Sequence, residues 1–171
     1  FLTNIDHDRK VNLQQAFLLM ALSWFSVAIL GSLPFVFSNL NLSFTDAVFE
    51  SMSGITTTGS TILDDLNSAP KGILLWRALL QWLGGIGIIV MAITLMPLMN
   101  VGGMRLFTVT SHQAPEKILP QSKAITIRLI LIYSVLTLLC SLFYKFFGMS
   151  YFDSITHSMT TIATGGFSNY N

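Results

Sequence analysis

The sequence predicts an all-α integral membrane protein built from repeated units, each with a long helix, a re-entrant loop and a second long helix. Composition is the first observation behind this prediction. Of 171 residues, 52% are hydrophobic and only 10% are charged, which is typical of a membrane protein and unusual for a soluble domain. The second observation is a set of long uncharged stretches, and the third is a pattern that occurs twice. The net charge of +1 excludes a strongly basic surface for nucleic acid.

Three apolar stretches are long enough to cross a bilayer. Charged residues are absent from 11–45 and from 78–104, and each interval exceeds the roughly 20 apolar residues that span a hydrocarbon core. A third apolar run carries Arg128 and Lys145 near its ends, where long cationic side chains can reach the headgroups. Spanning helices are therefore expected at 13–37, 74–98 and 124–147.

One sequence pattern follows both the first and the third of these spans. Its first copy starts at Ser43 and its second at Ser150, and equivalent residues lie 107 positions apart. The identical pairs are Ser43/Ser150, Asp46/Asp153, Ser51/Ser158, Met52/Met159, Ile55/Ile162, Thr57/Thr164 and Gly59/Gly166. Self-similarity of this kind indicates duplicated structural units.

Each copy begins with a short apolar segment that is expected to be a re-entrant helix. The segment 44–55 has about 12 residues, roughly 18 Å as a helix, which is half a bilayer. The pattern Ser-x-x-Asp at the start of each copy fits a capping box. The predicted helix caps are Ser43, Asp46, Ser150 and Asp153. The helices would begin at the outer water and end deep in the membrane, where a helix C-terminus carries roughly half a negative charge.

Each short helix runs into a turn rich in threonine and glycine. Backbone carbonyls from such turns replace the hydration shell of potassium in channel filters, and glycine allows backbone angles that are closed to other residues. The predicted ion ligands are Thr57, Thr58 and Gly59 in the first turn and Thr164, Gly165 and Gly166 in the second. Asp64 and Asp65 follow the first turn, where they either raise the local cation concentration or are ordinary loop acids.

The cations predict the orientation of the spans. They lie before the first span and around the loop after the second, at Arg9, Lys10, Arg105, Lys117, Lys123 and Arg128. These regions are expected to be cytoplasmic because Lys and Arg are enriched in cytoplasmic loops. The chain then divides into a cytoplasmic lead-in (1–12), a first repeat (13–98), a cytoplasmic connection (99–123) and a second repeat that stops after its loop (124–171).

Several other residues allow more than one interpretation. Glu50 is a carboxylate at membrane depth, and we expect it to be a buried partner behind the first turn. His157 aligns with it in the second copy and is expected to be hydrogen-bonded scaffold rather than a metal ligand or proton relay. Arg77, Trp76 and Trp24 have the character of membrane-interface anchors.

The glycines of the second span do not form a nucleotide-binding fingerprint. Gly84, Gly85 and Gly87 do not have the G-x-G-x-x-G spacing of that motif, and no strand is expected before them. Small residues in a spanning helix usually mark close helix packing. No nucleophile, base and orienting group occur together, so an enzyme is not expected. A membrane scaffold without transport activity stays as an alternative, although such a scaffold has no need for threonine–glycine turns after capped half-helices.

Three motifs together resemble the bacterial Trk/Ktr potassium uptake family. They are Phe49-Glu50-Ser51-Met52-Ser53-Gly54 with Thr56-Thr57-Thr58-Gly59, Trp82-Leu83-Gly84-Gly85-Ile86-Gly87-Ile88-Ile89-Val90, and Ala163-Thr164-Gly165-Gly166-Phe167-Ser168. The resemblance implies four helix–pore loop–helix repeats around a pseudo-fourfold axis, as in potassium channels. This chain would hold the first repeat and most of the second.

The same resemblance implies a function and partners. Gly59 and Gly166 would be filter glycines and their threonine and glycine neighbours carbonyl donors, with potassium as the transported ion and no covalent cofactor. Glycine rather than serine at 59 favours potassium over sodium, with a sodium-permeable or weakly selective transporter as the alternative. Ala163 stands where the first copy has Thr56, so the innermost ligand layer would be asymmetric. Family members lie in the bacterial inner membrane, contact lipid, form homodimers and are gated by a cytosolic nucleotide-binding ring.

Overall fold

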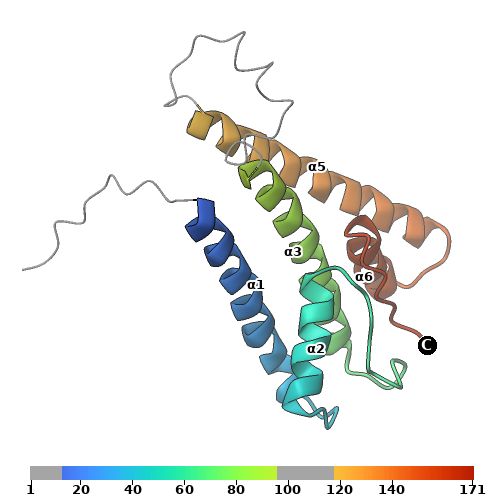
Figure 1. Ribbon diagram of the computed structural model, residues 1–171. Helices are drawn as coiled ribbons and strands as arrows, with labels where there is room; N and C mark the ends of the chain where they lie inside the picture. The colour runs from blue at the N-terminus through green and yellow to red at the C-terminus, as the bar shows by residue number, and fades with distance from the viewer. Residues whose placement is uncertain (1–12, 96–117) are drawn as a thin grey trace, which may run out of the picture.

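The computed structural model describes residues 13–95 and 118–171. In this part of the chain every regular element is a helix. The helices are α1 (Leu13–Val36), α2 (Phe44–Ile55), α3 (Lys71–Leu95), α5 (Ile118–Phe146) and α6 (Tyr151–Ile162) (Figure 1). The expected all-α architecture is confirmed, with a short helix after each of the long helices α1 and α5.

The three long helices correspond to the expected spans. Within the described residues, the segments long and apolar enough to cross a membrane are Gln14–Val36, Lys71–Ala92 and Ile125–Phe146. Helix α3 begins at Lys71 rather than at 74, directly after Pro70, a residue that suits the start of a helix. Helix α5 begins at Ile118, so the end of the expected connection at 99–123 is helical. The lead-in at 1–12 and the cations Arg9, Lys10, Arg105 and Lys117 lie outside the described residues.

The short helices begin at the serines expected to cap them. The Oγ of Ser43 accepts a hydrogen bond from the Asp46 N–H at 3.2 Å, and Asp46 Oδ2 accepts one from the Ser43 N–H at 3.3 Å. These two bonds form a complete capping box at α2. Ser150 caps α6 through the Asp153 N–H at 3.1 Å. The Asp153 carboxylate instead accepts from the Ser150 hydroxyl, so the two aspartates are not equivalent caps.

Helix α3 lies at the centre of the arrangement. It packs against both short helices, α2 and α6, and against α1 and α5 (Figure 1). The buried apolar core near α2 includes Ala28 and Phe35 of α1, Ala47 and Ile55 of α2, and Leu80 of α3. Both repeats therefore share a helix that belongs to the first.

Two adjacent glycines of α3 receive the ends of both short helices. A Cβ on Gly84 would overlap the backbone of Ile55, the last residue of α2. A Cβ on Gly85 would crowd the hydroxyl of Tyr133 and the backbone of Ala163, the residue that caps the end of α6. The expected packing role of these glycines is confirmed, and it is specific to the points where the half-helices end.

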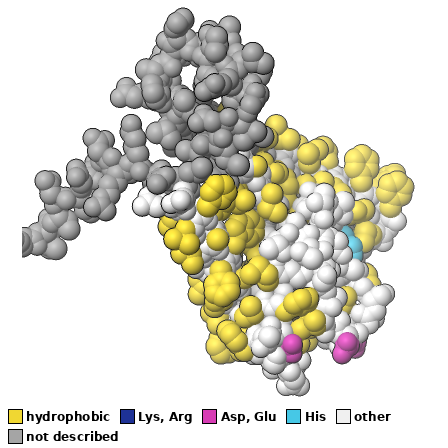
Figure 2. Space-filling model, in the orientation of Figure 1, with side chains coloured by type: hydrophobic (Ala, Val, Ile, Leu, Met, Phe, Trp, Pro, Cys, Tyr) yellow, Lys and Arg dark blue, Asp and Glu magenta, His cyan; other side chains and the backbone are white. Residues whose placement is uncertain are grey.

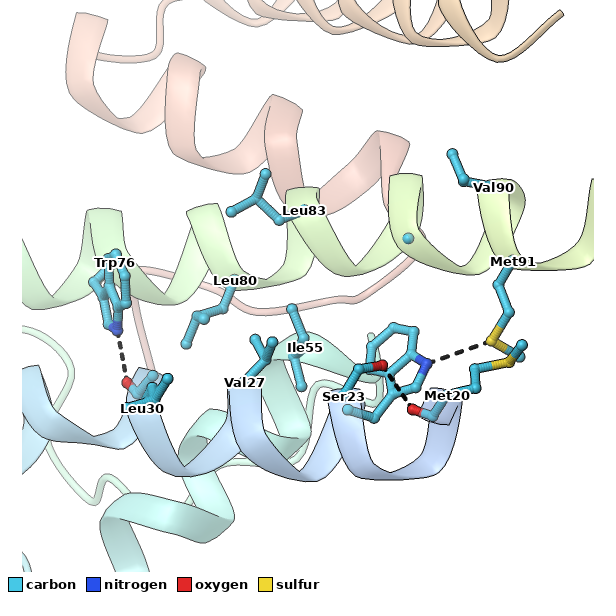
Figure 3. Close-up of a pocket in the computed structure, with 13 residues that line it drawn as sticks. Met20, Ser23, Val27, Leu30, Ile55, Trp76, Leu80, Leu83, Val90 and Met91 are labelled. Atoms are coloured by element: carbon cyan, nitrogen blue, oxygen red, sulfur yellow. Dashed lines mark hydrogen bonds between the residues drawn. The ribbon is translucent and has the colours of Figure 1, made fainter. Parts of the chain in front are cut away.

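An apolar groove of about 660 Å³ separates α1 from part of α3 (Figure 3). Toward one end, Trp24 Nε1 donates to the sulfur of Met91 at 3.4 Å, and toward the other Trp76 Nε1 donates to the Gly31 carbonyl at 2.9 Å. Both tryptophans therefore tie α1 to α3, a packing role that the sequence did not predict.

The outer faces of α1 and α5 are covered with hydrophobic side chains (Figure 2). Leu18 and Leu30 on α1 are 61% and 65% exposed, and Leu138 and Phe146 on α5 are 66% and 85% exposed. A surface of this extent is unfavourable in water and suits a hydrocarbon surrounding.

Candidate functional site

The loops after α2 and α6 share an unusual backbone conformation. Thr57 has a φ of 56° and Gly59 a φ of 79°, and at the equivalent positions Thr164 has 54° and Gly166 has 78°. Positive φ is easy for glycine but strained for a β-branched residue such as threonine. Strain of this kind costs about 1–3 kcal/mol per residue and clusters at functional sites. The same strained turn therefore occurs twice, at the spacing of the sequence repeat.

The N–H groups of both loops point back into the helices that precede them. Within the first loop, the N–H groups of Thr56, Thr57 and Thr58 donate to Met52, Gly54 and Ser53 at 2.9, 3.0 and 2.9 Å. Within the second, those of Ala163, Thr164 and Gly165 donate to Met159, Thr161 and Thr160 at 3.1, 2.9 and 2.9 Å. Among the described residues, no donor is bonded to the carbonyls of Thr57, Thr58, Gly59, Thr164 or Gly166. Hydrogen bonds within the described residues therefore leave these oxygens unused.

The two loops meet each other. A Cβ on Gly59 would overlap the carbonyl oxygen of Gly165, so the first loop touches the second at its glycine. Nothing lies within 4 Å of the corresponding position on Gly166. The ends of α2 and α6, each a source of partial negative charge, therefore converge on one region.

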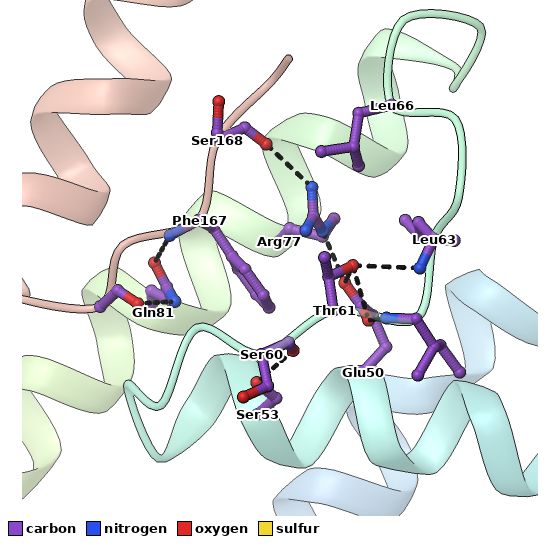
Figure 4. A network of polar contacts seen from close by, with 12 residues as sticks. Glu50, Ser53, Ser60, Thr61, Leu63, Leu66, Arg77, Gln81, Phe167 and Ser168 are labelled. Atoms are coloured by element: carbon purple, nitrogen blue, oxygen red, sulfur yellow. Dashed lines mark hydrogen bonds and ion pairs between the residues drawn. The ribbon is translucent and has the colours of Figure 1, made fainter. Parts of the chain in front are cut away.

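A buried ion pair holds the first loop against α2 (Figure 4). Glu50 is fully buried and accepts hydrogen bonds from Arg77 Nε at 2.7 Å, the Thr61 hydroxyl at 2.9 Å and the Ile62 N–H at 3.2 Å. The expected buried role of Glu50 is confirmed. The expectation for Arg77 is wrong, because its side chain is 1% exposed and cannot reach the headgroups.

Arg77 also contacts the second loop. Its Nη1 donates to the carbonyl of Ser168 at 3.0 Å, and its guanidinium lies over the ring of Phe167 at 4.1 Å from the centroid. The Nη2 atom has no hydrogen-bond partner among the described residues, and the cation–π contact with Phe167 is a further interaction of the guanidinium. One arginine therefore links the two loops.

Gln81 lies one helical turn after Arg77 and also reaches the second loop (Figure 4). It is fully buried, its Nε2 donates to the carbonyl of Gly165 at 2.8 Å, and its Oε1 accepts from the N–H of Phe167 at 3.2 Å. The role of Gln81 was not predicted from the sequence. The available signal was a polar side chain inside a span, where such groups are costly and usually face other protein.

A second polar network stabilises the segment after Gly166. Asp153 accepts from the Asn169 amide at 2.7 Å and from the Tyr170 hydroxyl at 2.6 Å. Burial alone would raise the pKa of Asp153, but hydrogen bonds, chiefly those from Ser150 and Tyr170, lower it below its usual value. His157 stacks on Tyr170, with its Nδ1 3.0 Å from the Asp153 carbonyl, in agreement with the expected scaffold role.

Residues of the acidic loop after the first turn make hydrogen bonds that stabilise the loop. Asp65 Oδ1 accepts from the N–H groups of Asn67 and Ser68, and the hydrogen bonds from Ser68 lower its pKa. The side chain of Asn171 donates to the Asp64 carbonyl at 3.0 Å and accepts from the Leu66 N–H at 3.1 Å. The two loop exits are thus joined at the outer edge of the site.

Comparison with known proteins identifies the family of the chain. The sequence model of the family described as TrkH, cation transport protein, matches residues 2–171. The chain is 48% identical over 155 residues to the Trk system potassium uptake protein TrkI of Halomonas elongata, covering 91% of this chain and 32% of that protein. It is 45% identical over 161 residues to the Trk system potassium uptake protein TrkH of Escherichia coli K12, covering 92% and 33%.

A solved structure agrees with these sequence matches. The crystal structure of the potassium transporter TrkH from Vibrio parahaemolyticus superimposes with a TM-score of 0.80 at 38% identity, covering 98% of this chain and 33% of that one. The chain thus spans about a third of the length of the relatives it matches. With a family match along nearly its whole length and the same helix–pore loop–helix repeats, the chain belongs to the TrkH family of cation transport proteins.

Proposed function

We propose that the protein takes up potassium across the bacterial inner membrane through a filter lined by backbone carbonyls. The observation that carries this proposal is the repeated turn, with left-handed residues at Thr57, Gly59, Thr164 and Gly166 and carbonyls that no described donor occupies. The proposed ligands are the carbonyl oxygens of Thr57, Thr58, Gly59, Thr164 and Gly166, together with that of Gly165, which also accepts from Gln81. The names of the relatives, potassium uptake proteins, support the choice of ion.

The chemistry follows from the two converging loops. A potassium ion that leaves water must exchange its hydration oxygens for others at fixed positions, and backbone carbonyls supply them. The ends of α2 and α6 add partial negative charge near these oxygens. The turn is strained at Thr57, and the bonds of Thr61 and Ile62 to Glu50 hold the chain that follows it.

The proposal includes an orientation and an assembly. The loops would face the outside and the connection between repeats the cytoplasm, as the cations predict. The family resemblance implies a homodimer and a cytosolic nucleotide-binding ring as partners. The apolar outer faces of α1 and α5 are suited to contact lipid or a second subunit.

Replacing Gly59 with serine in the full-length gene product tests the filter. The new Cβ would overlap the Gly165 carbonyl and would occupy a left-handed φ, so we expect the potassium-to-sodium uptake ratio to fall about tenfold, equivalent to about 1.4 kcal/mol. Rubidium and sodium uptake would be measured in a bacterial strain that lacks its own potassium uptake systems.

Gly72→Ser is the matched control. It introduces the same side chain on the same repeat, but nothing lies within 4 Å of its Cβ position, so its uptake ratio should equal that of the wild type. A wild-type ratio in Gly59→Ser, at normal protein levels, would refute the filter assignment. Sodium uptake equal to potassium uptake in the wild type would favour a weakly selective transporter.

A further inference from the structure

Gln81 bonds to two backbone groups that surround a single residue of the second loop. The Gly165 carbonyl belongs to the peptide unit before Gly166, and the Phe167 N–H belongs to the peptide unit after it. One primary amide binds both, with an Nε2–O distance of 2.8 Å and an N–Oε1 distance of 3.2 Å. Because the two peptide planes define φ and ψ of Gly166, the side chain of Gln81 fixes the left-handed conformation of that glycine.

Burial strengthens this arrangement. Gln81 has no exposed surface, and hydrogen bonds gain strength where water is excluded. Its donor and its acceptor are both used, so rotating the amide by half a turn would place like groups against each other at both ends. The side chain therefore has one favourable orientation, in which it holds two backbone groups of the second loop in place.

Gln81 also explains a difference between the two copies of the repeat. Thr58 in the first loop is aligned with Gly165 in the second. A Cβ on Gly165 would collide with the amide group of Gln81, whereas the Thr58 hydroxyl lies 2.8 Å from that of Thr56. Glycine is needed at 165 because a side chain of α3 fills the space that a threonine would take.

Arg77 reinforces the same contact from one turn away. Its Nη1 holds the Ser168 carbonyl at 3.0 Å, so α3 fixes backbone groups of the second loop at Gly165, Phe167 and Ser168. The Gly165 carbonyl that accepts from Gln81 also lies against Gly59 of the first loop, so the bond to Gln81 holds a backbone group at the point where the two loops touch. The amide of Gln81 therefore sets the direction of this carbonyl.

We propose that Gln81 is a positioning residue of the first repeat that sets the ion selectivity of the second loop. It touches no ion; it acts by orienting the Gly165 carbonyl and the turn at Gly166. This inference rests on the proposed function and assigns to one side chain part of the discrimination between potassium and sodium.

The test uses two substitutions in the full-length gene product. Gln81→Met has a similar length but removes the donor and the acceptor, and Gln81→Glu keeps an acceptor for Phe167 but puts a carboxylate oxygen against the Gly165 carbonyl. Both should lower the potassium-to-sodium uptake ratio about tenfold, equivalent to about 1.4 kcal/mol, with the KM for potassium raised more than the maximal rate is lowered. Uptake is normalised to the amount of protein in the membrane.

Thr137→Val is the matched control. Thr137 accepts from Trp82, the neighbour of Gln81 on α3, at 3.0 Å and donates to the Tyr133 carbonyl, so its loss weakens helix packing without touching the loop. It should change protein stability but not the uptake ratio or the KM. If Thr137→Val lowers the potassium-to-sodium uptake ratio as much as the Gln81 variants do, Gln81 acts only through helix packing and the proposal is overturned.

A binding measurement separates this proposal from the proposed function. Potassium should raise the unfolding temperature of the purified wild-type protein more than sodium does, and Gln81→Met should abolish that difference. If the wild type fails to transport potassium but shows this pattern, the transport proposal fails and the positioning role stands. If the wild type transports potassium and both Gln81 variants keep its uptake ratio and KM, the positioning role alone is refuted.

Discussion

Glu50 and Arg77 are charged side chains whose removal should affect both loops. They form an ion pair of 2.7 Å with exposures of 0% and 1%. A pair of this kind need not add net stability, but losing one partner leaves the other charge buried and uncompensated. Because Arg77 also reaches Ser168, such a loss is felt in both loops.

Glu50→Gln should destabilise the protein by about 3–5 kcal/mol, the usual cost of breaking a buried pair. Thermal unfolding of the purified protein measures this loss. Asp64→Asn, which neutralises an exposed carboxylate in the loop, is the control and should be close to neutral. Adding Arg77→Met to Glu50→Gln should recover part of the stability; a double variant whose loss equals the sum of the single losses would argue against a coupled pair.

Arg77 also marks a limit of what the sequence predicts. Its position near the end of a span suggested contact with headgroups, and nothing local distinguishes that role from pairing with Glu50, 27 positions earlier in the chain. Gln81 was missed for the same reason, since its partners at Gly165 and Phe167 come from the other repeat. Glu50 itself was predictable, because a carboxylate in the middle of an apolar half-helix requires a partner.

Helices were easier to predict than these contacts. The bounds of α2, Phe44–Ile55, agree with the apolar stretch between the Ser43 cap and the threonine turn, since capping and hydrophobic length are local properties. The glycines of α3 were predicted to pack closely. That Gly84 receives α2 and Gly85 receives α6 depends on tertiary geometry and could not be inferred from their spacing.

Gly84→Ala tests the contact between α3 and the end of α2. The added Cβ would overlap the backbone of Ile55, which cannot move away as a flexible side chain would, so we expect a loss of about 1–3 kcal/mol, as for an overpacked core. The unfolding temperature of the purified protein should fall. Gly72→Ala, with nothing within 4 Å of the new methyl group, should be neutral or stabilising because alanine favours the helix. Equal stability of the two variants would mean that α2 does not depend on this contact.

At the scale of the molecule, the described helices α1 and α5 present apolar outer faces, and the two loop exits are joined through Asn171, Asp64 and Leu66. In a membrane, both loop exits must therefore lie on the same side, because their polar groups must face water. The distribution of cations in the sequence predicts that this side is external.

Cysteine labelling tests the orientation. In a Cys140→Ala background, a cysteine at Asp64 should react with an impermeant thiol reagent added to intact cells, and a cysteine at Lys117 should react only after the cells are opened. Unmodified Cys140→Ala protein serves as the blank. Labelling of both sites from outside would show that the span assignment is wrong.

The position of Arg77 and Gln81 on α3 has a consequence for biosynthesis. A chain is made from its N-terminus, so α1, α2 and α3 are complete before the second loop is synthesised. The first loop can therefore fold against Glu50 and Arg77 as soon as α3 has been synthesised. The second loop is synthesised later and packs against Gln81 on a helix that already exists. The repeats therefore depend on each other in one direction. A substitution that disrupts α3 should impair both loops, whereas one that disrupts α6 should leave the folding of the first loop intact.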